Sequence, residues 1–300
     1  MLINPYNSED LSVYDIIINP KGGKGKSLKA LAKAEKILRE HGAEYTVHNT
    51  EYAGHATELA RELSQKPDAK IIVMGGDGSF NEVLNGITDF ANVTLGIVAC
   101  GTGNDFIRAS KHPKKVKDAI ELILKGNTGY IDYIDVGSRR CLNVAGAGMD
   151  VDVLIRYANM KAFHGKVKYY ASLFDTLAHV KWHKLRLTID GKTMDKSVFM
   201  IGVGNGTCIG GGMPICPDAK VDDGLLSVVI VNEMKKSRIP VELPGFLSGK
   251  HVKKDYTESY SAKEVRIEVL DDGKIELDGE VIDDKVLDCK VVHNTLKVYR

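Results

Sequence analysis

Three glycine-rich segments each follow a short apolar run of the chain. The most informative segment is residues 75–81, Gly-Gly-Asp-Gly-Ser-Phe-Asn, which lies between an apolar run and a helical pattern. Glycines at a strand-to-helix turn expose backbone N–H groups, and the helix N-terminus adds partial positive charge, so this turn suits a phosphate. Asp77 would repel a bare phosphate, which indicates either a cation-bound phosphate or a hydroxyl awaiting deprotonation. A tight turn with Asp77 as a helix cap explains the same residues equally well.

The other two glycine segments are residues 20–27 and residues 100–106. The first fails the Walker A phosphate-loop pattern because Pro20 stands where that pattern needs glycine. The second fails the dinucleotide-binding pattern because Phe106 occupies the third glycine position. Lysines in the first segment suit phosphates or form a solvated basic turn. Thr50 follows another strand-like run. At that position it either contacts a nucleotide or belongs to an ordinary loop.

Two acidic segments in the second half of the chain offer further chemistry. The acidic loop, residues 217–225, groups three aspartates whose oxygens suit a hard cation such as Mg²⁺, although acidic turns are common. The segment Leu277-Asp-Gly-Glu280 supplies a carboxylate on either side of a glycine, and one of them could act as general base toward an alcohol. Asp-Gly is also the standard two-residue hairpin turn, which we favour from spacing alone and also expect at Asp190-Gly191.

Composition and charge restrict the class of protein. The chain has 300 residues, 43% hydrophobic and 27% charged, with a net charge of +1, which predicts a globular protein and argues against nucleic acid as partner. Its five cysteines are scattered without a metal-binding spacing, so we expect reduced, buried thiols in a cytosol. No apolar run approaches the length of a transmembrane helix, and no signal segment precedes the first strand.

The periodicity of apolar residues changes near residue 130. Up to about residue 127, short apolar runs alternate with helical patterns, which predicts a doubly wound, mostly parallel sheet whose strand ends line one crevice. After that point, runs that alternate with period two predict a mainly antiparallel β layer or sandwich. Two helices are expected to interrupt it, one across about residues 153–178 and one around residues 239–247.

Taken in order, these segments resemble the catalytic-domain family of the diacylglycerol kinases, which includes sphingosine and ceramide kinases and bacterial soluble lipid kinases. The resemblance covers nearly the whole chain. It rests on Asn19-Pro20 with its glycine loop and on residues 75–83, 101–106, 222–225 and 278–280. Each motif is modest, but the ordered set is specific. Ser79 stands where many relatives have threonine, which keeps the hydroxyl.

The resemblance implies two domains with the active site between them. Residues 1–130, joined by a C-terminal segment at about 293–300, would form an ATP-binding α/β domain like that of the NAD kinases and phosphofructokinases. Residues 131–292 would form a β-sandwich domain for the lipid substrate.

The resemblance also assigns roles to residues. ATP would be bound by Asn19, Pro20, Lys21, Gly22, Gly23, Lys24, Thr50, Gly75, Gly76, Asp77, Gly78, Ser79, Phe80, Asn81 and Thr102. Asp77 would act near the phosphates and their Mg²⁺, and Glu280, with Asp278 beside it, would be the general base. A second, structural Mg²⁺ would be held near Asp223 with backbone carbonyls around Lys220 and Leu225.

The implied activity is that of a lipid kinase. The γ-phosphate of MgATP would pass to a lipid hydroxyl, with diacylglycerol as first choice and sphingoid bases, ceramide or phosphatidylglycerol as other acceptors. The alternatives are an NAD kinase-like enzyme that phosphorylates a soluble nucleotide, and a non-catalytic sensor with the same fold. We expect a cytoplasmic protein that associates transiently with a membrane surface, and a homodimer is left open.

Overall fold

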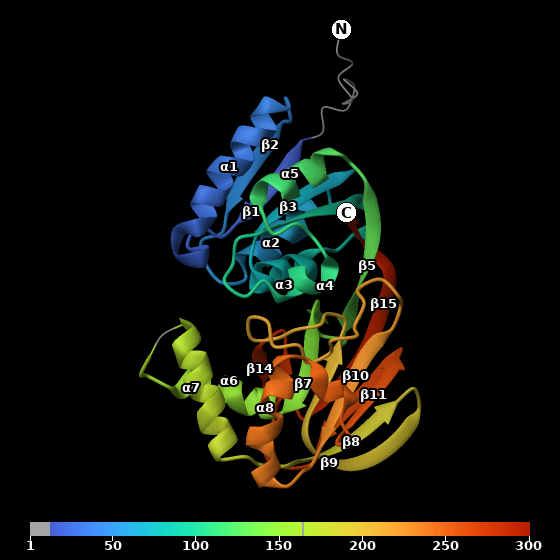
Figure 1. Ribbon diagram of the computed structural model, residues 1–300. Coiled ribbons are helices and arrows are strands. Elements are labelled where there is room, and N and C mark those ends of the chain that lie inside the picture. Colours follow the sequence, from blue (N-terminus) through green and yellow to red (C-terminus); the bar gives the residue numbers. More distant parts are fainter. Residues whose placement is uncertain (1–12, 164) are drawn as a thin grey trace. The chain divides into compact units, whose positions relative to one another are not determined.

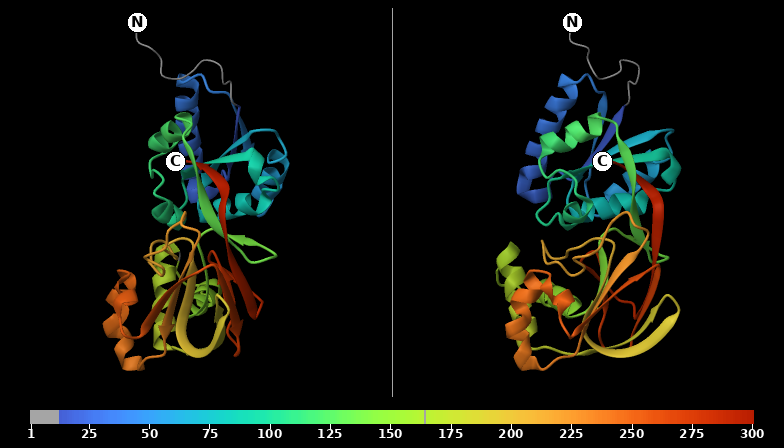
Figure 2. Two further views of the ribbon diagram at one scale, coloured as in Figure 1. Left: turned by 90° about the vertical axis from the view of Figure 1, so that its right-hand side faces the viewer. Right: turned by 45° about the vertical axis from the view of Figure 1, so that its right-hand side comes forward.

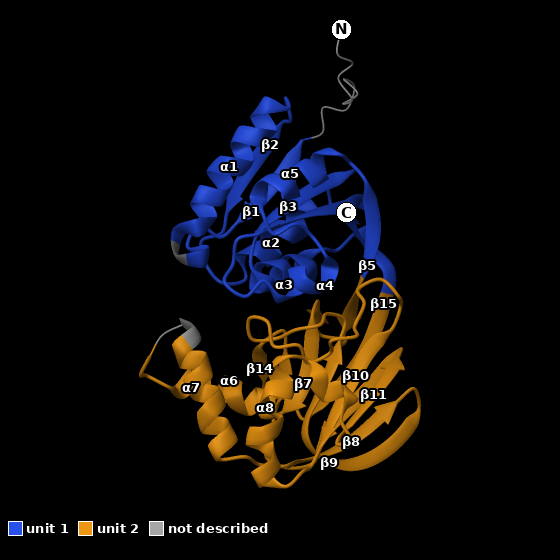
Figure 3. Cartoon of the chain, viewed as in Figure 1, with its two compact units in different colours: residues 1–131, 293–300 blue, residues 132–292 orange. Residues whose placement is uncertain are grey.

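The computed structural model describes residues 13–163 and 165–300, although the side chains of Lys24, Gly165 and Lys166 are not described. The chain folds into two compact units (Figure 3). Unit 1 contains the described residues up to Ile131 together with His293–Arg300, and unit 2 contains Asp132–Val292. The periodicity of the sequence changes at the place where the two units divide.

Unit 1 is built on a parallel sheet whose strands are almost entirely buried, except for the edge strand Tyr45–Asn49, which is only partly buried. Its strands are β1 (Tyr14–Ile18), β2 (Tyr45–Asn49), β3 (Ala69–Gly75) and β4 (Val93–Ala99), in the spatial order β4-β3-β1-β2. The end of β15 (Val286–Tyr299) adds to β4 in parallel, with Val298 opposite Leu95. Strands buried on both faces read as continuous apolar runs, which explains why the sequence predicted them well.

Helices cover both faces of this sheet (Figure 1, Figure 2). Helices α1 (Lys26–Glu40) and α5 (Val116–Leu124) pack together on one face and share a core with alternate residues of β1, β3 and β4. Helices α2 (His55–Leu63) and α3 (Asp77–Gly86) pack together against β1 and β3. The short α4 (Asp105–Ser110) follows β4.

Unit 2 is mainly antiparallel. Its strands are the last part of β5 (Thr128–Asp135), β6 (Arg140–Cys141), β7 (Val144–Gly148), β8 (His183–Ile189), β9 (Lys192–Gly204), β10 (Leu226–Asn232), β11 (Thr257–Ala262), β12 (Glu264–Val269), β13 (Ile275–Leu277), β14 (Glu280–Ile282) and the first part of β15. Their order is β14-β13-β7-β9-β8-β12-β15, and β9 also pairs with β10. A parallel α/β unit and an antiparallel β unit confirm the predicted fold class.

The helices of unit 2 correct one prediction. Instead of one helix across residues 153–178, there are two, α6 (Met149–Asn159) and α7 (Gly165–Ala178), and the chain leaves the helical conformation at Met160, where ψ is 115°. Asn159 and Gly165 flank the break, and both are weak helix formers. The second expected helix is confirmed as α8 (Ile239–Leu247).

Candidate functional site

The turns that follow β3 and β4 lie in backbone contact within unit 1. The N–H groups of Cys100 and Gly101 donate to the carbonyl oxygen of Gly75, at 2.8 Å and 3.1 Å. A Cβ atom on Gly101 would lie 2.5 Å from the Cα of Gly76, closer than real side chains approach. Only glycine therefore lets these two turns meet.

The loop after β1 reaches the same place. Gly23 has a φ of +57°, and a Cβ atom on it would lie 2.6 Å from the carbonyl oxygen of Cys100. At the start of α1, Ser27 donates from its Oγ to the carbonyl oxygen of Gly22 at 2.8 Å. The side chain of Lys24 lies outside the described residues. The three glycine turns of the sequence are thus gathered beside the ends of parallel strands, where open α/β sheets bind ligands.

Asp77 links two of these turns. It is the first residue of α3, and its Oδ1 accepts a hydrogen bond of 3.0 Å from the N–H of Phe106 in α4. Asp77 therefore does cap a helix, but the helix is α4, and this bond fixes the carboxylate at the glycine turns.

A pocket of about 350 Å³ lies in unit 1 beside these turns. Its lining residues are Asn19, Lys21, Thr50, Glu51, Tyr52, Ala53, Ala56, Ser79 and Glu82. Four of them were predicted to bind nucleotide, and the others were not. No spacing rule singles out Tyr52, whose ring stacks on that of His55 at 4.6 Å between centroids.

Other predicted nucleotide residues occupy different positions. Phe80 is 3% exposed and belongs to the core, and the Oδ1 of Asn81 accepts a bond of 3.1 Å from the Nδ2 of Asn85 one turn later in α3. Gly78 and Thr102 are exposed at the turns themselves. Side-chain contact with a ligand is therefore open to Thr102 but closed to Phe80.

In unit 2, Asp278 and Gly279 form the two-residue turn between β13 and β14. Their φ values are 50° and 84°, which confirms the hairpin turn that the dipeptide predicts. The carboxylate of Asp278 accepts bonds from the N–H groups of Leu142, Asn143 and Val144 at 2.7 Å, 2.9 Å and 3.1 Å. These donors lower the pKa of Asp278, but burial outweighs them and raises it.

Glu280, the first residue of β14, has a different environment. Its side chain is 65% exposed, and its Oε2 accepts a bond of 2.7 Å from the Nη2 of Arg139. Sequence reasoning missed Arg139, which precedes β6 and has no motif around it. Of the two predicted carboxylates, only Glu280 has a carboxylate that a ligand can reach, since that of Asp278 is engaged with backbone donors.

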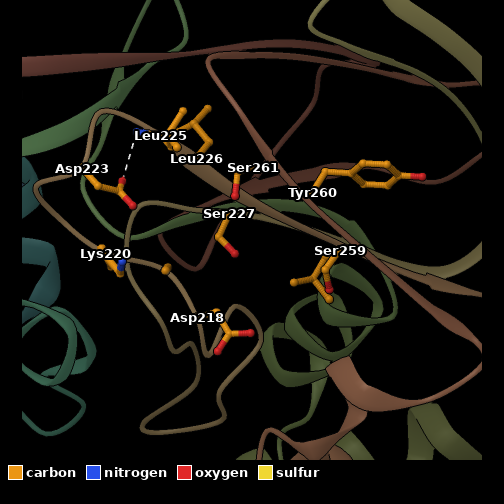
Figure 4. A pocket seen from close by; sticks show the side chains of 11 residues that line it. Asp218, Lys220, Asp223, Leu225, Leu226, Ser227, Ser259, Tyr260 and Ser261 are labelled. Atoms are coloured by element: carbon orange, nitrogen blue, oxygen red, sulfur yellow. Dashed lines mark hydrogen bonds between the residues drawn. The ribbon is translucent and has the colours of Figure 1, made fainter.

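The acidic loop is anchored in unit 2 by β5. The buried Asp132 donates from its N–H to the carbonyl oxygen of Val221 at 2.6 Å, and its Oδ2 accepts from the N–H of Gly224 at 2.8 Å. Within the loop, Oδ1 of Asp223 accepts from the N–H of Leu225 at 3.1 Å (Figure 4). Sequence reasoning missed the role of Asp132, which lies in a strand with an ordinary alternating pattern.

A pocket of about 180 Å³ borders this loop, and Figure 4 shows Asp218, Lys220 and Asp223 around it. The carboxylates of Asp218 and Asp223 are hard oxygen donors of the kind that Mg²⁺ prefers. Among the described residues, no group of three or more His, Cys, Asp and Glu side chains could hold a metal ion. A metal at the loop would therefore depend on backbone carbonyl oxygens.

Within the part of the chain that the structure describes, no helix combines the length and the apolar character needed to cross a membrane.

Comparisons with known proteins agree with the order of the motifs. Residues 14–136 match the family model of the diacylglycerol kinase catalytic domain, and residues 143–300 match that of the YegS C-terminal NAD kinase beta sandwich-like domain. The diacylglycerol kinase of Staphylococcus aureus (strain bovine RF122 / ET3-1) is 31% identical over 267 residues, covering 88% of this chain and 85% of the relative. That of Staphylococcus saprophyticus is 31% identical over 268 residues, covering 88% of each.

Solved structures show the same fold over the whole chain. A protein from Bacillus anthracis str. Sterne, named provisionally as a diacylglycerol kinase, is 25% identical with a TM-score of 0.75, covering 100% of this chain and 98% of its own. A second protein from that organism, named in the same way, is 27% identical with a TM-score of 0.72 and covers 98% of each chain. Since both domain models and relatives of nearly full length match, this chain belongs to the diacylglycerol kinase family of phosphotransferases.

Proposed function

We propose that this protein transfers the γ-phosphoryl group of MgATP to the hydroxyl of a lipid, with diacylglycerol as acceptor and phosphatidic acid as product. The observation that carries the proposal is the pocket of about 350 Å³ in unit 1 beside three glycine turns that meet backbone to backbone. The names of the curated relatives support diacylglycerol as the acceptor. Because diacylglycerol resides in membranes, we place the reaction in the cytoplasm at a membrane surface that the protein visits transiently.

The glycine turns are assigned to the phosphates of the nucleotide. Gly23, Gly76 and Gly78 have no side chain that would keep a phosphate oxygen away from the backbone, and the start of α3 adds partial positive charge. Lys21 lies in the pocket lining and supplies a full positive charge. The remaining pocket residues, among them Thr50 and Ser79, are left for the ribose and base.

Two Mg²⁺ sites are part of the proposal. Asp77 is assigned to the Mg²⁺ that accompanies the phosphates, because its carboxylate is fixed at the glycine turns. Asp223, with the carbonyl oxygens of Lys220 and Leu225, is assigned to a second, structural Mg²⁺. When bound, Mg²⁺ neutralises charge on the phosphate oxygens and leaves the protein with positioning as its main task.

Glu280 is assigned the role of general base. As the lipid hydroxyl oxygen bonds to the γ-phosphorus and the bond to the β-phosphate oxygen breaks, the hydroxyl proton passes to Glu280 and ADP leaves. Arg139 orients this carboxylate through the bond of 2.7 Å. Asp278 positions the turn, because its carboxylate is already engaged with three backbone N–H groups.

The test is transfer of radiolabelled phosphate from MgATP to a panel of lipids in detergent micelles, with NAD as the control acceptor. We expect labelled phosphatidic acid from the wild type and a loss of about a hundredfold or more in kcat for Glu280→Gln. Glu264→Gln is the matched control, because Glu264 is also an exposed strand residue, paired with Lys290 at 3.1 Å.

Label on NAD and on no lipid would overturn the proposal in favour of a nucleotide kinase. Label on a different lipid would keep the mechanism and change the acceptor. Activity of Glu280→Gln equal to that of Glu264→Gln would show that Glu280 is not the base.

A further inference from the structure

Two carboxyl groups are buried together in unit 2 with little hydrogen bonding. Asp150 lies in the first turn of α6 and Glu276 in β13, and the two residues are 3% and 1% exposed. Among the described residues, neither oxygen of Asp150 has a hydrogen-bond partner, and Oε1 of Glu276 has none either. Since buried polar atoms are nearly always paired, three unpaired carboxyl oxygens in one place call for an explanation.

A glycine makes the space into which these oxygens point. Gly146 of β7 is the register partner of Glu276. A Cβ atom on Gly146 would lie 2.6 Å from Oδ2 of Asp150, 3.4 Å from Oε1 of Glu276 and 2.7 Å from the carbonyl oxygen of Ile201. Oxygens from α6, β13 and β9 therefore converge on a small space that only glycine leaves free.

The charges around this space do not neutralise two carboxylates. Burial raises the pKa of Asp150 to about 7 and the pKa of Glu276 well above its usual range, and the charge of Asp150 also raises the pKa of Glu276. The backbone N–H groups of Val151 and Asp150 lower the pKa of Asp150 more than His183 of β8 does, and burial outweighs all three. His183 already pairs with Asp152 at 3.1 Å, and the charge of Asp152 raises the pKa of Asp150.

Among the described residues, the other titratable groups that shift the pKa of Glu276 add no positive charge. Asp278 raises the pKa of Glu276, and the N–H of Gly279 lowers it. Nearby thiols are buried with raised pKa values and stay neutral: Cys141 of β6, Cys216 after β9 and Cys289 of β15. Two like charges in so apolar a place repel strongly, so the pair holds at most one negative charge near neutral pH.

The pair is bonded directly to the turn that carries the proposed base. Oε2 of Glu276 accepts a hydrogen bond of 2.7 Å from the N–H of Gly279. Gly279 lies between Asp278 and Glu280, so a displacement of Glu276 displaces the turn and the strand that begins with Glu280.

We propose that Asp150 and Glu276 share one proton, and that the pair acts as a positioning device for the Asp278–Gly279 turn and so for Glu280. With the proton in place, the pair carries a single negative charge, and Oε2 of Glu276 keeps its bond with the N–H of Gly279. When the proton leaves, the two carboxylates repel and the turn loses its fixed support. The effect on catalysis rests on the proposed function, whereas the shared proton does not.

The direct test is infrared spectroscopy of the carboxylic acid C=O stretch at neutral pH. We expect a band of a buried, protonated acid in the wild type that is lost in Asp150→Asn and in Glu276→Gln. Asp284→Asn is the matched control, because Asp284 is exposed in the same unit and its replacement leaves the band unchanged. No protonated band in the wild type, or a band that both variants keep, overturns the inference.

The catalytic test is the pH profile of kcat and KM for the same proteins. We expect wild-type kcat to fall by about tenfold as pH rises above neutrality, because the turn moves, and KM for ATP to stay within about twofold. Asp150→Asn keeps a neutral group in place, so its kcat loses this alkaline fall while Asp284→Asn keeps it. Identical profiles for all three proteins would overturn the positioning role.

The two proposals fail separately. If the protein shows the protonated band but has no lipid kinase activity, the proposed function is wrong and the shared proton stands. If the protein is an active lipid kinase without the band, only the shared proton is wrong. Melting temperatures of every variant show whether an effect on kcat comes from a loss of folded protein.

Discussion

Two hairpins of unit 2 turn on the same dipeptide and differ in almost everything that surrounds it. Asp190 and Gly191 join β8 to β9 with φ values of 43° and 83°, and the second hairpin joins β13 to β14 with 50° and 84° at Asp278 and Gly279. In both, the aspartate carboxylate holds a neighbouring segment by its backbone N–H groups. The dipeptide therefore fixes the conformation of the turn in both places.

The two hairpins differ in the hydrogen-bond partners of the aspartate and in the residues that are buried beside the turn. Asp190 is exposed and accepts two bonds of 3.0 Å, from the N–H groups of Lys263 and Glu264. Asp278 accepts from three N–H groups and from the thiol of Cys141. Beneath it lies the buried Glu276. A turn signature therefore predicts the shape of the backbone, whereas the chemistry of the turn depends on burial and on partners distant in sequence.

The largest effect that would separate the two hairpins is removal of the aspartate. Asp278→Ala leaves three backbone N–H groups without an acceptor, so we expect a loss of the order of 3 kcal/mol in the free energy of unfolding and a loss of kinase activity. Asp190→Ala, the matched change, exposes its two donors to water and costs about 1 kcal/mol or less. Urea unfolding and lipid phosphorylation of both variants measure the difference. Equal losses of stability would remove the distinction between the two turns.

The second prediction concerns pH. The pKa of Asp150 is raised from its ordinary value of 3.8 to about 7 by burial, so its contribution to stability is full below 3.8 and is lost as pH rises through about 7. Over that interval the free energy of unfolding falls by up to about 1.4 kcal/mol per pH unit from this group. Melting temperatures across the interval should therefore fall more in the wild type than in Asp150→Asn.

Asp190→Asn is the control for the pH prediction. Its carboxylate belongs to the exposed hairpin, so the variant should keep the wild-type pH dependence. Asp271 adds no change across this interval, because its pKa is lowered from 3.8, chiefly by the N–H groups of Lys184 and Gly273 against the effect of burial, and its contribution is complete above 3.8. A slope in Asp150→Asn equal to that of the wild type would contradict the assignment of the raised pKa.

The sequence predicted those parts of the molecule that have a local cause. The buried strands of unit 1 read as apolar runs, and both Asp-Gly turns follow from the left-handed conformation that this dipeptide tolerates. The meeting of the three glycine turns follows from a parallel sheet, because the ends of its strands lie at one edge. The order of the motifs correctly indicated the family.

The features that the sequence did not predict have no signal in the residues next to them. Strand β7, Val-Ala-Gly-Ala-Gly, was missed because glycine and alanine are poor strand formers, yet Gly146 is required by the carboxyl oxygens around it. Glu276 lies among charged residues and reads as exposed, whereas pairing with β7 buries it. Likewise, only the fold brings Arg139 to Glu280, which is 141 residues away.

The third prediction uses the glycines of the two turns. Gly191→Ala and Gly279→Ala both place a Cβ atom on a residue with φ near +84°, and neither glycine has an atom within 4 Å of that position. We therefore expect the same cost, about 1 kcal/mol, at both turns. Only Gly279→Ala should also lower kcat, because strain at residue 279 displaces a backbone N–H that is bonded to Glu276 and precedes Glu280. A stability loss much larger at one turn would show that the two backbones are not equivalent.

The smallest effect concerns the exposed ion pair of each hairpin. Arg186 makes two bonds to Asp195 across the first hairpin, at 2.8 Å and 3.0 Å, and Arg139 makes its bond to Glu280 beside the second. Exposed ion pairs contribute little to stability, so Arg186→Gln and Arg139→Gln should both leave the melting temperature almost unchanged. Arg139→Gln should nevertheless lower kcat by about threefold, because Glu280 loses the partner that orients it, while Arg186→Gln should not. If both variants keep wild-type kcat and melting temperature, the bond to Arg139 has no part in positioning the base, and that task falls to the turn and the buried pair beneath it.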